Sequence, residues 1–219
     1  MSQTAKVPAF VLIFRMTALA ISLFYLFDSL SLHAAMTGPG EFGGMWRFLT
    51  IWTFTVNVLI AISMAIQCLQ PGRHNWHSLL SVGMGLNFYV LLAYWGLYFL
   101  DKSLVQGDAS LPLYRQSYLH VGMILLCWIE GFVFHRIWVK TGRVIALFFA
   151  FFLGYMAWLE LVLMPINGAF PYPFLNDMSF VQRMMFHGGS MLVSALFMGL
   201  AYVVSRWSNG FAPGWPKTD

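Results

Sequence analysis

Two side chains with complementary chemistry stand near the start of two apolar segments, a threonine at position 50 and a histidine at position 120. A threonine hydroxyl is a weak nucleophile at neutral pH and reacts only when a base removes its proton. A neutral imidazole is the side chain best suited to accept that proton near pH 7. Thr50 and His120 are therefore a candidate nucleophile and base, provided that the fold brings them together.

Polar residues recur at helical spacing in three of the apolar segments. Because a helical turn takes 3.6 residues, positions i, i+3 and i+7 share one face. The stripes are Thr50, Thr53 and Asn57; Ser117, His120, Cys127 and Glu130; and His187, Ser190 and Ser194. A polar group in hydrocarbon is costly unless it finds a partner. We therefore expect the three polar faces to meet inside a helical bundle.

The elements that position these residues are predicted to be membrane-spanning helices. Of the 219 residues, 59% are hydrophobic and 9% charged, which leaves too little polar surface to cover a soluble globule. A helix needs about 20 apolar residues to cross a bilayer. Such segments lie at about 8–28, 47–69, 77–99, 117–138, 142–165 and 182–206. The sequence predicts an all-α polytopic membrane protein, a bundle of six transmembrane helices that forms a single domain over 1–219.

Basic residues predict the orientation of the bundle. One side of the membrane carries Lys6, Arg73, Arg136, Lys140, Arg143, Arg206 and Lys217, and the other carries Arg47, Lys102, Arg115 and Arg183. The positive-inside rule places the richer side, with both termini, in the cytoplasm. In a bacterium the protein would then lie in the inner membrane. Because the basic residues are scattered, no nucleic-acid partner is expected.

The two cysteines, Cys68 and Cys127, suggest neither a disulfide nor a metal site, and we expect no cofactor. Glycines predict close helix contacts, because they let backbones approach. The candidates are Gly83, Gly85, Gly188 and Gly189.

Depth in the membrane decides which polar residues can act together. At about 1.5 Å per residue, Thr50 and His120 both lie roughly 5 Å below the outer surface. Glu130 lies roughly 15 Å deeper than His120. We expect it to be structural, bonded to Asn57, Asn87 or Arg15. Asp101, Glu160 and His187 belong to the same outer layer as Thr50 and His120.

Several short runs carry a resemblance that extends over nearly the whole chain. They are GGMWRFLT (43–50), WGLYFLD (95–101), LHVGM (119–123) with Glu130 beyond it, GYMAW (154–158), YPFL (172–175) and Arg183 ahead of FHGGS. In this order and spacing they resemble the androgen-induced membrane protein family. That family also contains the androgen-dependent regulator of tissue factor pathway inhibitor.

The resemblance implies an activity. Members of the family are multi-span threonine hydrolases that cleave fatty-acid esters of hydroxy fatty acids with one Thr and one His. The Thr after the GG-x-W-aromatic run falls on Thr50, and the His upstream of the intramembrane Glu falls on His120. Asp101 matches the W-x-x-Y-x-x-D run and is the candidate for orienting His120, with Glu160 as the second choice.

The sequence also departs from the family pattern. Thr53 stands where the family has Asp, the second His near His120 is missing, and His187 stands where an aromatic residue is usual. The substrate would be a lipid ester, whose acyl chain needs an apolar groove beside Thr50. Residues expected to form this substrate site are Phe48, Leu119, Met123, Met185 and His187.

Two other functions are compatible with the polar residues. His120 and His187 at one depth on different helices are a possible haem ligand pair, which would make the protein an electron carrier. The polar stripes are also compatible with the path of a transporter. Neither alternative explains Thr50 as directly as ester hydrolysis does.

Overall fold

The computed structural model describes residues 7–35, 41–70, 77–105, 112–134 and 141–207. In these ranges six helices are long and apolar enough to cross a membrane, and no strand is present. The first three and the last are α1 (Ala9–Ala35), α2 (Leu49–Leu69), α3 (His77–Leu100) and α10 (Phe180–Trp207). The predicted class, an all-α bundle of six spanning helices, is confirmed.

The fourth and fifth spans are composite. The fourth consists of α5 (Leu113–Ser117), η3 (Tyr118–Gly122), α6 (Met123–Trp128) and η4 (Ile129–Phe134), and the fifth of α7 (Thr141–Ala157), η5 (Trp158–Leu163) and α8 (Met164–Asn167). The segments η3, η4 and η5 are π-helical. His120, Glu130 and Glu160 each lie in one of them. Single π turns inside α-helices are frequent at functional sites.

Three short helices complete the described chain: η1 (Gly44–Arg47), η2 (Lys102–Val105) and α9 (Pro173–Asn176). The second span begins at Leu49 rather than at the predicted 47, because η1 forms a separate 3-10 turn before it. The fourth span begins at Leu113, earlier than predicted, and its predicted end at 138 lies outside the described residues.

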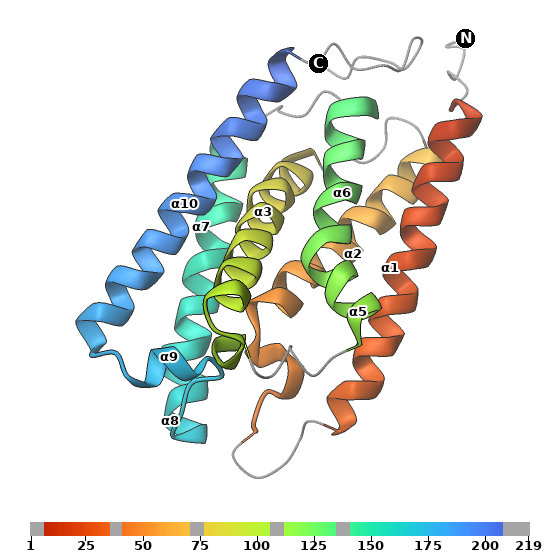
Figure 1. Ribbon diagram of the computed structural model, residues 1–219. Helices are drawn as coiled ribbons and strands as arrows, with labels where there is room; N and C mark the ends of the chain where they lie inside the picture. Colours follow the sequence, from red (N-terminus) through yellow and green to blue (C-terminus); the bar gives the residue numbers. More distant parts are fainter. Residues whose placement is uncertain (1–6, 36–40, 71–76, 106–111, 135–140, 208–219) are drawn as a thin grey trace.

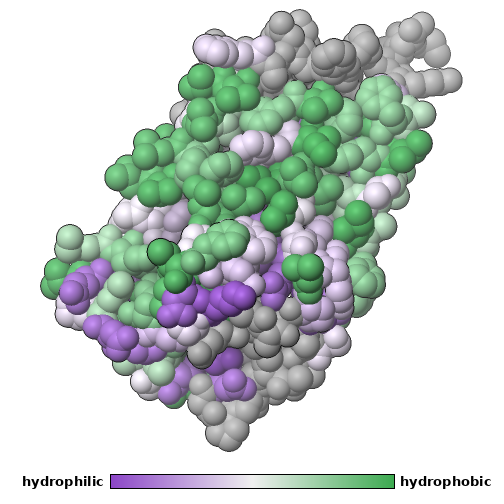
Figure 2. Space-filling model, in the orientation of Figure 1, coloured by the Kyte–Doolittle hydropathy of each residue, from purple (hydrophilic) through white to green (hydrophobic). Residues whose placement is uncertain are grey.

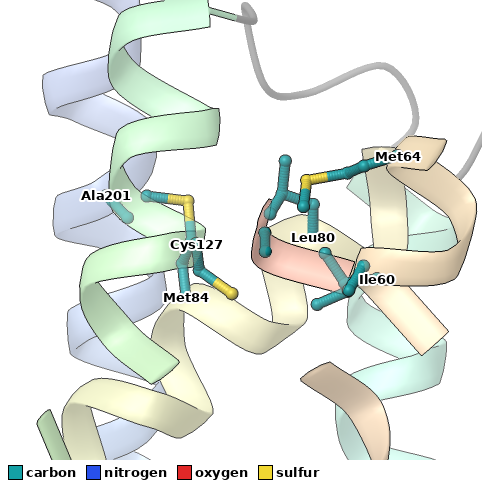
Figure 3. Packing of buried hydrophobic residues seen from close by; sticks show 8 residues of the cluster. Ile60, Met64, Leu80, Met84, Cys127 and Ala201 are labelled. Carbon is teal, nitrogen blue, oxygen red and sulfur yellow. The ribbon is translucent and has the colours of Figure 1, made fainter. Parts of the chain in front are cut away.

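The α3 helix lies at the centre of the bundle (Figure 1), where it packs against α2, α6, α7 and α10, while α1 covers α2. One apolar cluster joins five of these helices, α1, α2, α3, α6 and α10, in the half of the bundle away from η1. Figure 3 shows its labelled members, Ile60, Met64, Leu80, Met84, Cys127 and Ala201. Large apolar side chains also cover the outside of the bundle, as expected of a surface that faces lipid.

Two polar contacts fix the interior. Glu130 pairs with Arg15 of α1 at 2.5 Å, and both side chains are almost completely buried. Of the three partners expected for Glu130, Arg15 is therefore the one observed. Asn57 and Asn87 instead bond each other, exchanging hydrogen bonds of 2.7 and 2.8 Å between α2 and α3. Removing one partner of such a buried ion pair costs about 3–5 kcal/mol, because the other charge stays buried and unpaired.

The predicted glycine contacts are correct for two positions of four. A Cβ on Gly83 would lie 2.6 Å from Ile60 Cδ1, and a Cβ on Gly85 would lie 2.8 Å from Met198 Cβ. For Gly188 and Gly189 the expectation is wrong, since a Cβ there would meet nothing within 4 Å. Gly188 and Gly189 are exposed on α10, whereas Gly83 and Gly85 are buried on the central helix α3.

The described start of α1 and the end of α10 lie at the same end of the bundle (Figure 1). Figure 2 shows hydrophobic residues over most of one face, and hydrophilic residues gathered toward the end that carries α8 and α9. Several basic residues used to predict the orientation lie outside the described residues, namely Lys6, Arg73, Arg136, Lys140 and Lys217.

Candidate functional site

A cavity of about 250 Å³ lies where the start of α2, the second half of α3, α7 and the first half of α10 meet. Its walls are mostly apolar and aromatic. The polar side chains among its lining residues are Thr50, Tyr89, Tyr94, Tyr155, Tyr172, His187 and Ser190. A mostly apolar cavity with a few polar groups is the usual form of a site for a small organic or lipid ligand.

Thr50 is the second residue of α2, so its position depends on the turn that starts this helix. The two glycines before it, Gly43 and Gly44, have φ values of 91° and 48°, a left-handed conformation that glycine adopts without strain. They reverse the chain into η1, and the extended Phe48 then leads into α2. The run that precedes Thr50 in the sequence therefore forms the turn that delivers it to the cavity.

Aromatic side chains from distant parts of the chain hold this turn. The Tyr172 hydroxyl accepts the N–H of Leu49 at 2.9 Å, and the Tyr155 hydroxyl donates to the carbonyl of Arg47 at 2.9 Å. The indole N–H groups of Trp52 and Trp158 both donate to the carbonyl of Trp46, at 2.9 and 3.0 Å. The runs GYMAW and YPFL thus both contact the run that ends at Thr50, although they lie about 100 residues further along the chain.

Thr50 itself is 7% exposed and lines the cavity. It lies in the first turn of α2, at the positive end of the helix dipole, where the N–H of Leu49 donates to Tyr172 and those of Ile51 and Trp52 donate to the carbonyl of Phe48. The N–H of Thr50 itself is therefore the first-turn donor nearest the nucleophile that the helix does not use. A developing negative charge beside Thr50 would be stabilised by both features.

His120 lies in the π-helical segment η3 and is 2% exposed. Its ring stacks on the ring of Tyr94, with centroids 3.4 Å apart and planes 7° from parallel. Tyr94 lines the cavity together with Thr50, whereas His120 is not among the lining residues. In the described part of the chain no hydrogen bond joins Thr50 to His120. Tyr94 is the residue that contacts both the cavity and the imidazole.

Asp101 lies just beyond α3 and is exposed. Its Oδ1 accepts the N–H of Ser103 at 2.8 Å, and this bond lowers the pKa of the Asp101 carboxyl. The carboxylate therefore caps η2 in solvent, while His120 is buried. This position supports a structural role at the end of α3 better than the predicted role of orienting the imidazole.

The residues predicted to form the substrate site fall into two groups. Phe48 and His187 line the cavity. Leu119 and Met123 belong to a packed cluster with Phe54, Val58 and Tyr118, and Met185 is 72% exposed on α10. These three residues are therefore not among those that line the cavity. Sequence reasoning missed Tyr89, Tyr155 and Tyr172, of which Tyr155 and Tyr172 stand in two of the runs that carry the resemblance. Ser190, which the third polar stripe included, does line the cavity.

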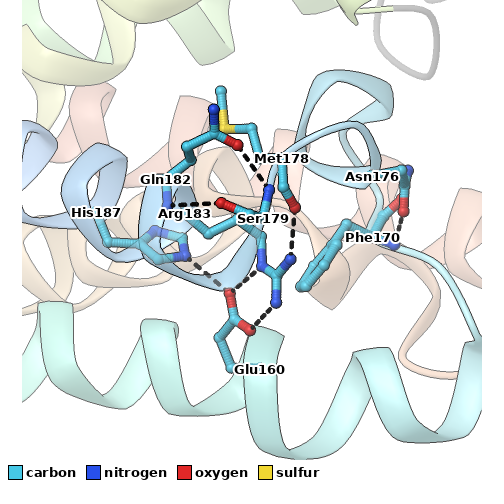
Figure 4. Close-up of polar contacts among 8 residues, drawn as sticks. All are labelled: Glu160, Phe170, Asn176, Met178, Ser179, Gln182, Arg183 and His187. Carbon is cyan, nitrogen blue, oxygen red and sulfur yellow. Dashed lines mark hydrogen bonds and ion pairs between the residues drawn. The ribbon is translucent and has the colours of Figure 1, made fainter.

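A second polar cluster consists of Arg183, Glu160 and His187 (Figure 4), of which His187 lines the cavity. The Nε and Nη2 of Arg183 donate to the two oxygens of Glu160, at 2.9 and 3.1 Å. The Nε2 of His187 lies 3.3 Å from Glu160 Oε1. Glu160 had been expected in this layer, and the structure brings it to His187 and Arg183.

The family model for FAR-17a/AIG1-like proteins matches residues 10–206. The chain belongs to this family. Neither a curated protein nor a solved structure matches it. The family match includes every run that carries the resemblance and both residues of the candidate pair. As a member of the FAR-17a/AIG1-like family, the protein is a multi-pass membrane protein, consistent with its six spanning helices.

Proposed function

We propose that this FAR-17a/AIG1-like protein is an intramembrane lipid-ester hydrolase with Thr50 as nucleophile and His120 as base. One observation carries the proposal: Thr50 lines an apolar cavity from the first turn of α2. The turn before this helix is bonded by Tyr155 and Tyr172, which stand in the runs that carry the resemblance. The resemblance implies fatty-acid esters of hydroxy fatty acids as the substrate class. The integral membrane position allows such a lipid to enter without crossing water.

The reaction follows from the chemistry of the pair. The Thr50 hydroxyl loses its proton to His120 and attacks the ester carbonyl, the ester C–O bond breaks, and the alcohol leaves with the proton. Water then hydrolyses the acyl-Thr50 ester. The N–H of Thr50 is our candidate for stabilising the oxyanion, because it lies at the positive end of the helix and the N–H groups of its neighbours in the first turn already have acceptors.

The direct proton transfer needs His120 within hydrogen-bond reach of Thr50, and catalytic hydrogen bonds often close only when substrate binds. Tyr94 is the group whose contacts support that closure, since it touches the imidazole and lines the cavity beside Thr50. Among the predicted orienting groups, Asp101 remains a weaker proposal, because its carboxylate is exposed and bonded to Ser103.

The contacts of the two histidines favour hydrolysis over haem binding. The His120 ring lies flat against Tyr94, and the Nε2 of His187 is directed at Glu160. Haem ligation through both rings would have to break these contacts. A transporter would use the cavity as part of a path, but it gives no role to Thr50 in the first turn of α2.

Covalent labelling with a fluorophosphonate tests the nucleophile. Wild type in detergent should be labelled and should hydrolyse a fatty-acid ester of a hydroxy fatty acid, while Thr50→Ala should lose both activities and stay folded. Thr55→Ala is the matched control, because Thr55 lies on the same helix and its hydroxyl only donates to the Ile51 carbonyl. Labelling that persists in Thr50→Ala would overturn the assignment.

A further inference from the structure

His187 presents a second imidazole to the cavity that contains Thr50. Its Nε2 lies 3.3 Å from a carboxylate oxygen of Glu160. Since a carboxylate only accepts hydrogen bonds, Nε2 must carry the proton, and in the neutral ring Nδ1 is then an acceptor. The residues that the structure describes give Nδ1 no partner. Nδ1 is therefore the ring atom of His187 that can accept a proton from a ligand or water.

The carboxylate that fixes His187 is itself held in place. Arg183 binds both oxygens of Glu160, donates from Nη1 to the carbonyl of Met178 at 2.8 Å, and lies over the ring of Phe170 at 4.7 Å (Figure 4). A bidentate guanidinium fixes the plane of a carboxylate. Arg183, Glu160 and His187 thus form a chain of contacts that orients the imidazole.

Polar groups continue from this cluster along the same face of α10. Ser190, one turn further on, donates to the carbonyl of Phe186 at 2.8 Å and accepts the hydroxyl proton of Tyr89 at 2.7 Å. The fifth span contributes apolar lining, with Phe152 and Leu159 among its residues. The cavity therefore has one polar edge along α10, starting at the Arg183 end, and apolar walls suited to an acyl chain.

Hydrolysis through an acyl-enzyme needs a water molecule in this apolar space and a base to activate it. We infer that His187 is that base for the second half of the reaction, distinct from His120, which serves the first half. The water oxygen bonds to the acyl carbon while its proton passes to Nδ1 of His187. The bond between the acyl carbon and Thr50 Oγ1 then breaks, and the Thr50 oxygen takes that proton from Nδ1 of His187 as the fatty acid leaves, which returns both residues to their starting state. This inference rests on the proposed function.

Pre-steady-state kinetics with a p-nitrophenyl fatty-acid ester separate the two halves of the reaction. We expect His187→Gln and His187→Phe to keep the initial burst of p-nitrophenolate and the rate of fluorophosphonate labelling. Their steady-state turnover should fall by about 10²–10⁴-fold, the usual contribution of a general base. Acyl-Thr50 should then accumulate and be detectable by mass spectrometry. His187→Gln keeps an amide N–H for Glu160, so it isolates the loss of the base.

Leu192→Phe is the control, since Leu192 lies on the exposed face of α10 and the change adds an aromatic ring to the same helix. It should behave like wild type. Steady-state turnover of both His187 variants at the wild-type level would overturn the inference, and so would a burst lost together with turnover, which would place His187 in the first half. Wild type that shows neither labelling nor turnover would overturn the proposed function and this inference together.

Discussion

Thr50 owes its chemical environment to being the second residue of a helix. Its type and depth were readable from the sequence, because a threonine near the start of an apolar segment must lie close to the membrane surface. Its partner was readable only in part. Depth predicts that His120 lies in the same layer, but the stacking of its ring on Tyr94 depends on how two helices are rotated, and spacing within one helix contains no such information.

Tyr94 is expected to orient His120 through its ring rather than through its hydroxyl. Tyr94→Phe keeps an aromatic face against the imidazole, so turnover should remain within about threefold of wild type, a change of less than 1 kcal/mol. Tyr94→Leu removes the face and should lower kcat by at least tenfold, about 1.4 kcal/mol. Ester turnover, with KM and kcat resolved, checks this. Equal kcat for Tyr94→Leu and wild type would remove Tyr94 from the site.

Asp101 and His120 are predicted to lie in the same layer, but we expect their substitutions to have different effects on turnover. Asp101→Asn should leave turnover near the wild-type value, because Asn also caps a helix turn with its side-chain oxygen. His120→Ala should abolish turnover, since it deletes the base. Both variants are compared by ester turnover at neutral pH. A loss in Asp101→Asn that approaches the loss in His120→Ala would restore Asp101 as the group that orients the imidazole.

At the scale of elements, helix positions were predictable and helix irregularities were not. The apolar lengths gave α2 and α3 to within a few residues, because a span must match the thickness of the bilayer. The π turns at His120, Glu130 and Glu160 have no such signal. A π turn inserts one residue and changes the face that follows. Leu119 and Met123, on either side of His120, pack in the core instead of lining the cavity.

Glycine at the crossing of α3 and α10 offers a test of element packing. Gly85→Ala would bring a Cβ to 2.8 Å from Met198 Cβ and 3.0 Å from the carbonyl of Ser194. Overpacking of this kind costs about 1–3 kcal/mol, so the thermal unfolding temperature in detergent should fall. Gly199→Ala on α10 meets nothing within 4 Å and should not lower it. Equal unfolding temperatures for both variants would contradict the close contact.

For the whole molecule, composition alone determined the class, since so few charged residues exclude a soluble fold. The convergence of the GGMWRFLT, GYMAW and YPFL runs was not predictable, because their contacts join residues more than 100 positions apart in the chain, as between Trp158 and Trp46. The contacts within the Arg183–Glu160–His187 cluster were not predictable either. Each residue had been placed in the outer layer by depth, but only tertiary structure brings the three together at one edge of the cavity.

Orientation in the membrane is the last prediction, and it decides from which leaflet a lipid reaches the cavity. The distribution of basic residues predicts that η2 faces the outside and that the end of α2 faces the cytoplasm. Lys102 in η2 and Gln70 at the end of α2 are both exposed and lie at opposite ends of the bundle.

A membrane-impermeant maleimide should therefore label Lys102→Cys in intact cells, and Gln70→Cys only after permeabilisation. Wild type, measured in parallel, reports any reaction of Cys68 and Cys127. The reverse pattern would mean that the cavity opens toward the cytoplasmic leaflet, and lipid esters of that leaflet would then be the substrates to test.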